Sequence, residues 1–258
     1  MSPIHRSSLE SGTKLDTPRG RGWWRLRLFP EAGEAVGSFS SGLVPWDGEP
    51  GPSAWPTDTR DAAARRARGQ VRRYCAANRL NRLGTLTYAG DGQHNPKALR
   101  QDLGDFFRAL RREVGGSLPY LWVPEWHPGG HGLHAHFAVG RYIAQGAIKR
   151  RWARGHVHIK LLGDLPVGSG SLAEARLAAR YLSKYLAKDL DEGGQPSGLH
   201  RYEVAQGFQP QSVVLVDDTK AEVLARAARQ MGGEPATVWQ SSDERDWAGP
   251  PAVWAEWT

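Results

Sequence analysis

The sequence is poor in cysteine and in long apolar runs. Its single cysteine, Cys75, excludes a disulfide framework and a zinc site built on thiolates, and it is typical of a reducing cytoplasm. No apolar run approaches the roughly 20 residues that span a bilayer. Residues 1–12 lack the apolar core of a secretory signal. We therefore expect a cytoplasmic location and no membrane partner.

Glycine, proline and tryptophan, in contrast, are abundant. The 258 residues include 31 glycines, 17 prolines and 11 tryptophans. This much glycine and proline predicts many turns and excludes a pure helical bundle. The length suffices for one large domain with a sizeable core, or for one domain with appendages.

The positive charge is concentrated in one stretch. The chain has a net charge of +7, yet residues 60–112 alone hold 13 basic and 4 acidic residues, whereas residues 213–258 hold 4 basic and 8 acidic ones. Residues 59–81 are rich in alanine and arginine and predict a basic helix, which indicates a polyanionic partner. The arginines expected to contact it are Arg65, Arg66, Arg68, Arg72 and Arg73.

Residues 1–59 are nearly neutral and dense in glycine, proline and serine. This composition builds a core poorly, so we expect a loosely ordered N-terminal arm. Within it, residues 19–27 interleave basic and tryptophan side chains, as a contact for single-stranded nucleic acid would. A short amphipathic strand that docks on the core fits the same residues at least as well.

Hydrophobic periodicity and turn signals predict the elements from residue 83 onward. We expect a strand at 83–88, a helix from the N-cap Asn95, strands at 119–126 and 133–139, a helix at 143–154, a strand at 155–162 and a helix from 171 to about 190. The first six follow the order βαββαβ. This order predicts an α+β fold with a ferredoxin-like antiparallel sheet, helices on one face of it, and the last helix as an addition.

A histidine pair lies on one of the predicted strands. Because side chains alternate along a strand, His134 and His136 share one face, and the two imidazoles can converge on one divalent ion. A turn centred on Gly129-Gly130 places Glu125 opposite His134, and a turn shifted by one residue places it opposite His136. In both registers Glu125 faces the same side. The three side chains therefore predict a metal site of nitrogen and oxygen ligands.

Other histidines show how weak a bare pair is as a signal. His156 and His158 have the same spacing, without such a carboxylate hairpin beside them. His127 and His131, in the connection between the two strands, are either spare ligands or solvated loop residues. A lone His-x-His pair is more often structural than metal-binding, so the neighbouring Glu125 is what strengthens the prediction.

The last predicted helix carries two tyrosines and two lysines on one stripe. Tyr181, Lys184, Tyr185 and Lys188 stand at positions i, i+3, i+4 and i+7. A phenol is a poor nucleophile at neutral pH unless a metal or a nearby cation stabilises the phenolate. Taken alone, the helix is more simply an amphipathic helix with half-buried tyrosines; its significance comes from its combination with the histidines.

Three short motifs appear in a fixed order. They are the strand Thr85-Leu-Thr-Tyr88, Glu125 followed by His134-Ala-His136, and Tyr181-x-x-Lys184-Tyr185. This set resembles the HUH endonucleases (histidine–hydrophobe–histidine), and within them the rolling-circle replication initiators of plasmids and single-stranded-DNA phages. The resemblance covers about residues 83–190. It implies an RRM-like sheet with a catalytic last helix, and a division into the arm 1–59, an HUH nickase domain at 60–192 and an accessory segment at 193–258.

The resemblance also implies roles for the residues. Glu125, His134 and His136 would bind Mg²⁺ or Mn²⁺, and Tyr181 would be the nucleophile with Lys184 beside it, although Tyr185 could be a second or even the principal nucleophile. The partner would be a single-stranded or hairpin DNA origin, which the arginines of the basic helix and Lys188 would contact. No P-loop motif occurs in the sequence, so unwinding would need a host helicase, and a host DNA polymerase would extend the primer.

The implied activity is a nick and a later rejoining of origin DNA, through a 5′-phosphotyrosine and a free 3′-OH. Two alternatives stay open. An HUH transposase or relaxase would use the same chemistry on other DNA. A non-catalytic nucleic-acid-binding module would use the basic helix and the sheet alone, and its binding would weaken with salt but not with a chelator.

Overall fold

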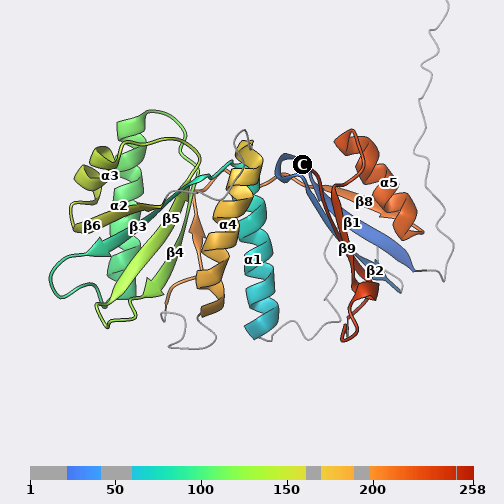
Figure 1. The fold of residues 1–258 in the computed structure, drawn as a ribbon, viewed down its shortest axis with the longest axis horizontal. Helices are drawn as coiled ribbons and strands as arrows, with labels where there is room; N and C mark the ends of the chain where they lie inside the picture. Colours follow the sequence, from blue (N-terminus) through green and yellow to red (C-terminus); the bar gives the residue numbers. More distant parts are fainter. Residues whose placement is uncertain (1–21, 42–59, 161–169, 189–197, 248) are drawn as a thin grey trace, which may run out of the picture.

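A computed structural model describes residues 22–41, 60–160, 170–188, 198–247 and 249–258. Within these ranges the chain forms two antiparallel sheets of five strands each, accompanied by helices (Figure 1). The predicted α+β class is therefore confirmed. None of the described helices is long and apolar enough to cross a membrane.

The first sheet contains the motifs singled out in the sequence. Its strands are β3 (Arg82–Tyr88), β4 (Tyr120–Trp126), β5 (Leu133–Val139), β6 (Gly155–Lys160) and β7 (Glu203–Val204). They lie in the order β6-β3-β5-β4-β7. With helices α2 (Pro96–Val114) and α3 (Gln145–Trp152), strands β3 to β6 follow the predicted βαββαβ order.

Helices cover both faces of this sheet, whereas the sequence predicted helices on one face and one additional helix. Helices α2 and α3 lie on one side, and α1 (Arg60–Ala77) and α4 (Ser171–Lys188) lie on the other (Figure 1). As predicted, Leu182 and Leu186 of α4 are fully buried, in one core with Leu83, Leu121 and Val123 of the sheet. Leu190, expected beside them, lies outside the described residues.

Local sequence explains the start of α2. The side chain of Asn95 accepts hydrogen bonds from the backbone N–H groups of Lys97 and Ala98, and Pro96 occupies the first helical position. The apolar positions predicted at helical spacing, from Leu99 to Leu110, are buried against the sheet. This helix fills the face of the first sheet opposite α4.

The second sheet corrects the expectation of a loosely ordered arm at residues 1–59. Its strands are β1 (Trp23–Phe29), β2 (Glu34–Ser40), β8 (Val213–Asp217), β9 (Thr237–Gln240) and β10 (Ala252–Glu256), in the order β8-β1-β2-β10-β9, with helix α5 (Lys220–Met231) on one face (Figure 1). Residues 23–40 are thus a hairpin, and the amphipathic strand is the interpretation that holds. Residues 1–21 and 42–59 lie outside the described part.

The hairpin β1–β2 is ordered by partners from the other end of the chain. Leu26 pairs with Leu215, and Ala35 pairs with Ala255. These residues share a core with Val223 of α5. A segment too poor in apolar residues to fold alone is thereby buried by strands that follow it by nearly the whole chain length, which local composition could not reveal.

A buried carboxylate joins the second sheet to α1. Glu34 of β2, 2% exposed, accepts hydrogen bonds from Arg72 at 2.7 and 3.0 Å and from Arg73 at 3.0 Å. The guanidinium of Arg72 also lies 5.1 Å from the ring centroid of Trp254, and that of Arg73 lies 4.8 Å from the ring centroid of Phe29. The two sheets therefore meet through an ion-pair cluster.

Candidate metal centre and tyrosine pair

The hairpin β4–β5 sets the register of the candidate site. Glu125 pairs directly with His134, and Val123 pairs with His136, so the turn is the one centred on Gly129-Gly130. Cross-strand partners share a face, so the carboxylate and both imidazoles stand on the face that α4 covers. The hairpin closes with a hydrogen bond from the His127 N–H to the Gly132 carbonyl.

The three side chains converge on one point. Oε2 of Glu125 lies 2.8 Å from Nε2 of His134 and 2.8 Å from Nε2 of His136, and the two Nε2 atoms lie 3.0 Å apart. The three residues are 9%, 5% and 6% exposed. Among the described residues this is the one group of three or more His, Cys, Asp or Glu side chains that could hold a metal ion.

The spacing of the three atoms fits an octahedral ion. An ion about 2.1 Å from its ligands separates neighbouring ligand atoms by about 3.0 Å in octahedral geometry, and by about 3.4 Å in tetrahedral geometry. The observed separations of 2.8 to 3.0 Å match the first. Two ring nitrogens and a carboxylate oxygen that face one another without water need a cation or shared protons between them. The donor set therefore fits a hard divalent cation such as Mg²⁺ or Mn²⁺; the identity of the ion is a proposal.

Thr85 orients one of the two imidazoles. It stands on β3 directly opposite His136, and its Oγ1 lies 3.0 Å from Nδ1 of that ring. A ring whose Nδ1–H is held in this way presents Nε2 toward the ligand position, which is the usual arrangement around metal-binding histidines. The strand motif that contains Thr85 was singled out in the sequence, but its contact with His136 depends on strand register across the sheet.

Helix α4 brings both tyrosines to the site. The ring of Tyr185 stacks on the imidazole of His136, with centroids 3.7 Å apart and planes inclined by 13°. The Tyr185 hydroxyl donates a hydrogen bond of 2.7 Å to the hydroxyl of Tyr181. Burial raises the pKa of Tyr185 above its usual value, and its hydrogen bond to Tyr181 adds to the effect, as does the Glu125 carboxylate. Tyr185 is therefore held protonated, as a donor toward Tyr181.

Two lysines flank Tyr181. The ammonium group of Lys184 lies 5.6 Å from the centroid of the Tyr181 ring, and that of Lys160 on β6 lies 4.9 Å from it. Lys184 was predicted to lie beside the tyrosines, but Lys160 was not. The signal was present in the alternation of β6, because Lys160 pairs with Leu83 and so shares the face of Thr85. The side chain of Lys188 lies outside the described part.

The other predicted residues lie away from this centre. On α1, Arg65 and Arg66 are exposed and Arg68 is half-buried, whereas Arg72 and Arg73 are engaged with Glu34. We therefore assign Arg72 and Arg73 to the contact between the sheets and do not retain them as DNA contacts.

The remaining histidines stay outside the set of three. The Nδ1 atom of His127 accepts a hydrogen bond from the Gly129 N–H, and His131 contacts the carbonyl of Tyr88. His156 and His158 are exposed on β6.

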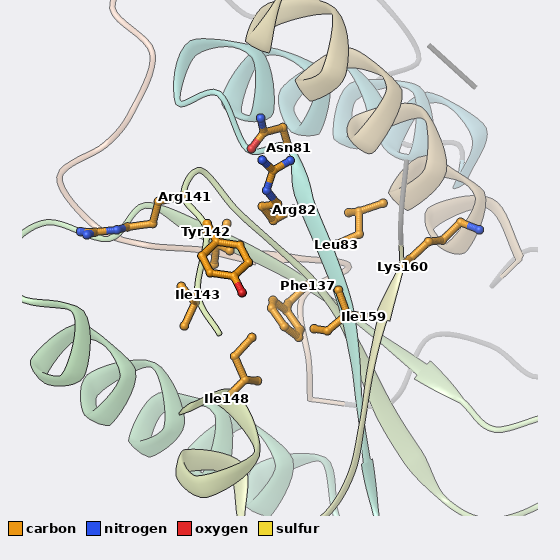
Figure 2. A pocket seen from close by; sticks show the side chains of 11 residues that line it. Asn81, Arg82, Leu83, Phe137, Arg141, Tyr142, Ile143, Ile148, Ile159 and Lys160 are labelled. Carbon is orange, nitrogen blue, oxygen red and sulfur yellow. The ribbon is translucent and has the colours of Figure 1, made fainter. Parts of the chain in front are cut away.

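A pocket of about 260 Å³ opens at the other end of the first sheet (Figure 2). It lies where β5 and β6 end and β3 begins. Its floor is apolar, with Phe137, Ile148 and Ile159, and Arg82 and Tyr142 lie at its margin. Glu125 and His134 stand at the opposite end of their strands, so this pocket is distinct from the candidate metal centre. No motif in the sequence predicted it.

The fold and the site define a class of protein. An antiparallel sheet carries a buried carboxylate and two histidines on one strand pair, and a helix on the same face presents two hydroxyl groups and a lysine. Residues 81–190, which include all of these side chains, match the family model of the replication-associated proteins of the ORF2 type. This similarity supports a protein of the replication-initiator type, which interacts with DNA. Searches of the curated proteins and of the solved structures found no match.

Proposed function

We propose that the protein initiates rolling-circle replication as an HUH endonuclease, by nicking and later rejoining one strand of its origin DNA. The observation that carries the proposal is the stack of Tyr185 on His136, because it joins the tyrosine pair to the Glu125–His134–His136 group in one site. The domain that does this would span residues 60–192. Residues 193–258 would be accessory, although β7 joins the first sheet.

In this proposal the phenol of Tyr181 is the nucleophile. Its oxygen forms a bond to the phosphorus of the scissile phosphodiester while the bond from phosphorus to the 3′-oxygen breaks. The 3′-oxygen takes up a proton and becomes the 3′-OH that a host polymerase would extend. A bound Mg²⁺ or Mn²⁺ would polarise the phosphoryl oxygens. The ester bond is conserved in the 5′-phosphotyrosine, so the reverse attack by a 3′-OH can rejoin a strand.

The neighbours of Tyr181 suit this role. The Tyr185 hydroxyl already donates to the Tyr181 oxygen, so it stabilises that oxygen when the Tyr181 proton is lost. Lys160 and Lys184 place two positive charges beside the Tyr181 ring. The ring of Tyr185 instead packs on His136, and its hydroxyl keeps its proton. This difference favours Tyr181 as the principal nucleophile and Tyr185 as its hydrogen-bond donor.

The DNA would approach along the exposed arginines of α1. Arg65 and Arg66 are exposed and Arg68 is half-buried, and phosphate contacts from such side chains supply affinity without sequence preference. Lys188 stays a predicted contact. The chain would rely on a host helicase for unwinding and would act in the cytoplasm, as the sequence predicts.

A covalent-adduct assay tests the proposal. The protein is incubated with Mn²⁺ and with labelled single strands that tile the replicon encoding it, and the products are separated on a denaturing protein gel. We expect a labelled adduct with one origin strand, and none with chelator, with His134→Ala or with Tyr181→Phe/Tyr185→Phe. His158→Ala is the matched control, because His158 belongs to the exposed His-x-His pair, and it should react normally.

Two results would contradict the proposal. One is the absence of an adduct with every strand of the replicon. The other is an adduct that persists in the double tyrosine variant. If transposon ends or a transfer origin were nicked instead, the chemistry would stand but the protein would be a transposase or a relaxase.

A further inference from the structure

The second sheet has one face that α5 does not cover. Leu26, Leu28 and Leu215 point toward α5 and share a core with it. Because side chains alternate, Trp23, Arg25 and Arg27 of β1 point to the other side. The same side carries Trp254 of β10 and Trp239 of β9, because the register links Arg27 to Val36, Val36 to Trp254 and Trp254 to Trp239. We call the surface formed by Trp23, Arg25, Arg27, Trp239 and Trp254 the open face.

Basic and aromatic side chains alternate across the open face. Arg25 and Arg27 are exposed, and the three tryptophans are half-buried. The ring of Trp239 is braced edge-on by Trp247, with centroids 5.4 Å apart. This is the residue-level pattern that residues 19–27 displayed in the sequence, now placed on a sheet. A sheet that presents arginines between indole rings suits a strand whose phosphates and bases alternate.

The acidic side chains on this face are already paired. The register places Glu34 and Glu256 on it, side by side. Glu34 is bound by Arg72 and Arg73, and Glu256 lies 3.3 Å from a guanidinium nitrogen of Arg176. The positive charges of Arg25 and Arg27 are therefore not offset by these carboxylates, and the face favours an anion.

Helix α1 extends the same surface. Arg65, Arg68 and Arg72 stand at i, i+3 and i+7 and so form one stripe of the helix. Arg72 anchors the end of that stripe on the open face, over the ring of Trp254. Helix α1 stands on the side of the second sheet opposite α5 (Figure 1). The arginines of α1 and the open face thus belong to one side of the second sheet.

We propose that the open face is a second binding surface for single-stranded DNA, separate from the nicking site and reached across the arginine stripe of α1. The inference rests on the proposed function for its biological setting, since a nickase releases a single strand beside α1. Its physical basis is independent of the metal centre: Arg25 and Arg27 contact phosphates, and Trp23 and Trp239 stack on bases.

Binding of a fluorescein-labelled oligothymidylate of about 20 nucleotides, followed by anisotropy in chelator, tests the surface without nicking. Arg25→Ala/Arg27→Ala should weaken binding about tenfold. It should also lower the slope of log affinity against log salt by about 1.4, as expected for the loss of two phosphate contacts on a single strand. Trp23→Ala should weaken binding about tenfold with an unchanged slope. Arg226→Ala/Arg229→Ala removes the same charge from α5 and is the matched control.

The controls separate this proposal from the proposed function. His134→Ala should bind the oligothymidylate like the wild type, so a failure to nick leaves the surface standing. Circular dichroism and the melting temperature establish that each variant is folded. An affinity and a salt slope unchanged in Arg25→Ala/Arg27→Ala would overturn the proposal, and would mean that residues 42–59 or a protein partner cover the open face instead.

Discussion

The phenol ring of Tyr185 lies flat on the imidazole of His136, with ring centroids 3.7 Å apart. This contact fixes the distance between helix α4 and strand β5 at the point where the chemistry is proposed. It also divides the labour between the two tyrosines: Tyr185 is packed against the ligand set and donates a hydrogen bond, and Tyr181 accepts that bond with two lysines beside its ring.

The two tyrosines should differ in their variants. Tyr181→Phe should abolish the covalent adduct. Tyr185→Phe keeps the stack on His136 but loses the donor, so it should slow adduct formation by about a hundredfold, the usual cost of one missing donor to a developing oxyanion. Single-turnover rates with the cognate strand provide the measurement, and exposed Tyr142→Phe is the control. The reverse pattern would make Tyr185 the nucleophile.

Mn²⁺ should stabilise the wild-type protein against heat. An ion at a hundred times its dissociation constant contributes about 2.7 kcal/mol to the free energy of unfolding. The gain in melting temperature should disappear in His134→Ala and in Glu125→Gln, because each removes one of the three converging atoms. His158→Ala should keep it. An equal gain in all four proteins would show that the ion binds elsewhere.

Thr85→Val should weaken metal binding without removing a ligand. The hydroxyl that holds Nδ1 of His136 is lost, and partners of this kind usually account for about a 10- to 100-fold change in metal affinity. Isothermal titration with Mn²⁺ measures the change. Thr87→Val, on the same face of the same strand, is the matched control and should bind like the wild type; equal affinity of the two variants would argue against an orienting role for Thr85.

Glu34→Ala should destabilise the fold by about 2 kcal/mol. The substitution leaves Arg72 and Arg73 without their shared carboxylate, and the cost falls below that of a fully buried pair because Arg72 is 35% exposed and stays partly hydrated. Urea unfolding measures the loss. Glu31→Ala, an exposed carboxylate in the same hairpin, should change stability by less than about 0.5 kcal/mol.

Cys75 should resist alkylation in the native protein. Burial raises the pKa of its thiol well above the usual value, so the reactive thiolate is suppressed in the folded state. The thiol therefore stabilises the fold fully below about pH 8.5, and this contribution is lost as the pH rises above that value. A thiol reagent at about pH 8 should react slowly with the native protein and rapidly after denaturation. Rapid reaction in the native state would contradict the burial.

The ligand group and its hairpin could be predicted from the sequence because they are local. Glu125, His134 and His136 lie within twelve residues, and strand alternation with a glycine turn fixes which of them face one another. The contacts of Thr85 and Lys160 depend on pairing between strands that are far apart along the chain, which no local pattern specifies. The stack of Tyr185 on His136 likewise depends on how α4 docks.

The second sheet shows the same limit at the level of the fold. Local composition predicted a loose arm where β1 and β2 lie, because those strands obtain their core from residues 213–256. The arginines of α1 were predicted correctly as a basic helix, but the ion pairs of Arg72 and Arg73 with Glu34 could not be predicted from helical spacing.

The strands of the first sheet occupy one uninterrupted stretch, residues 82–204, whereas those of the second come from residues 23–40 and 213–256. One folding unit is thus nested inside the other. During synthesis the inner unit can form as soon as it emerges, while β1 and β2 wait for partners that are made last. A ribosome that stops before residue 213 would release a chain with a candidate catalytic sheet but an unpaired N-terminal hairpin, and such a chain would be exposed to proteolysis and aggregation at that hairpin.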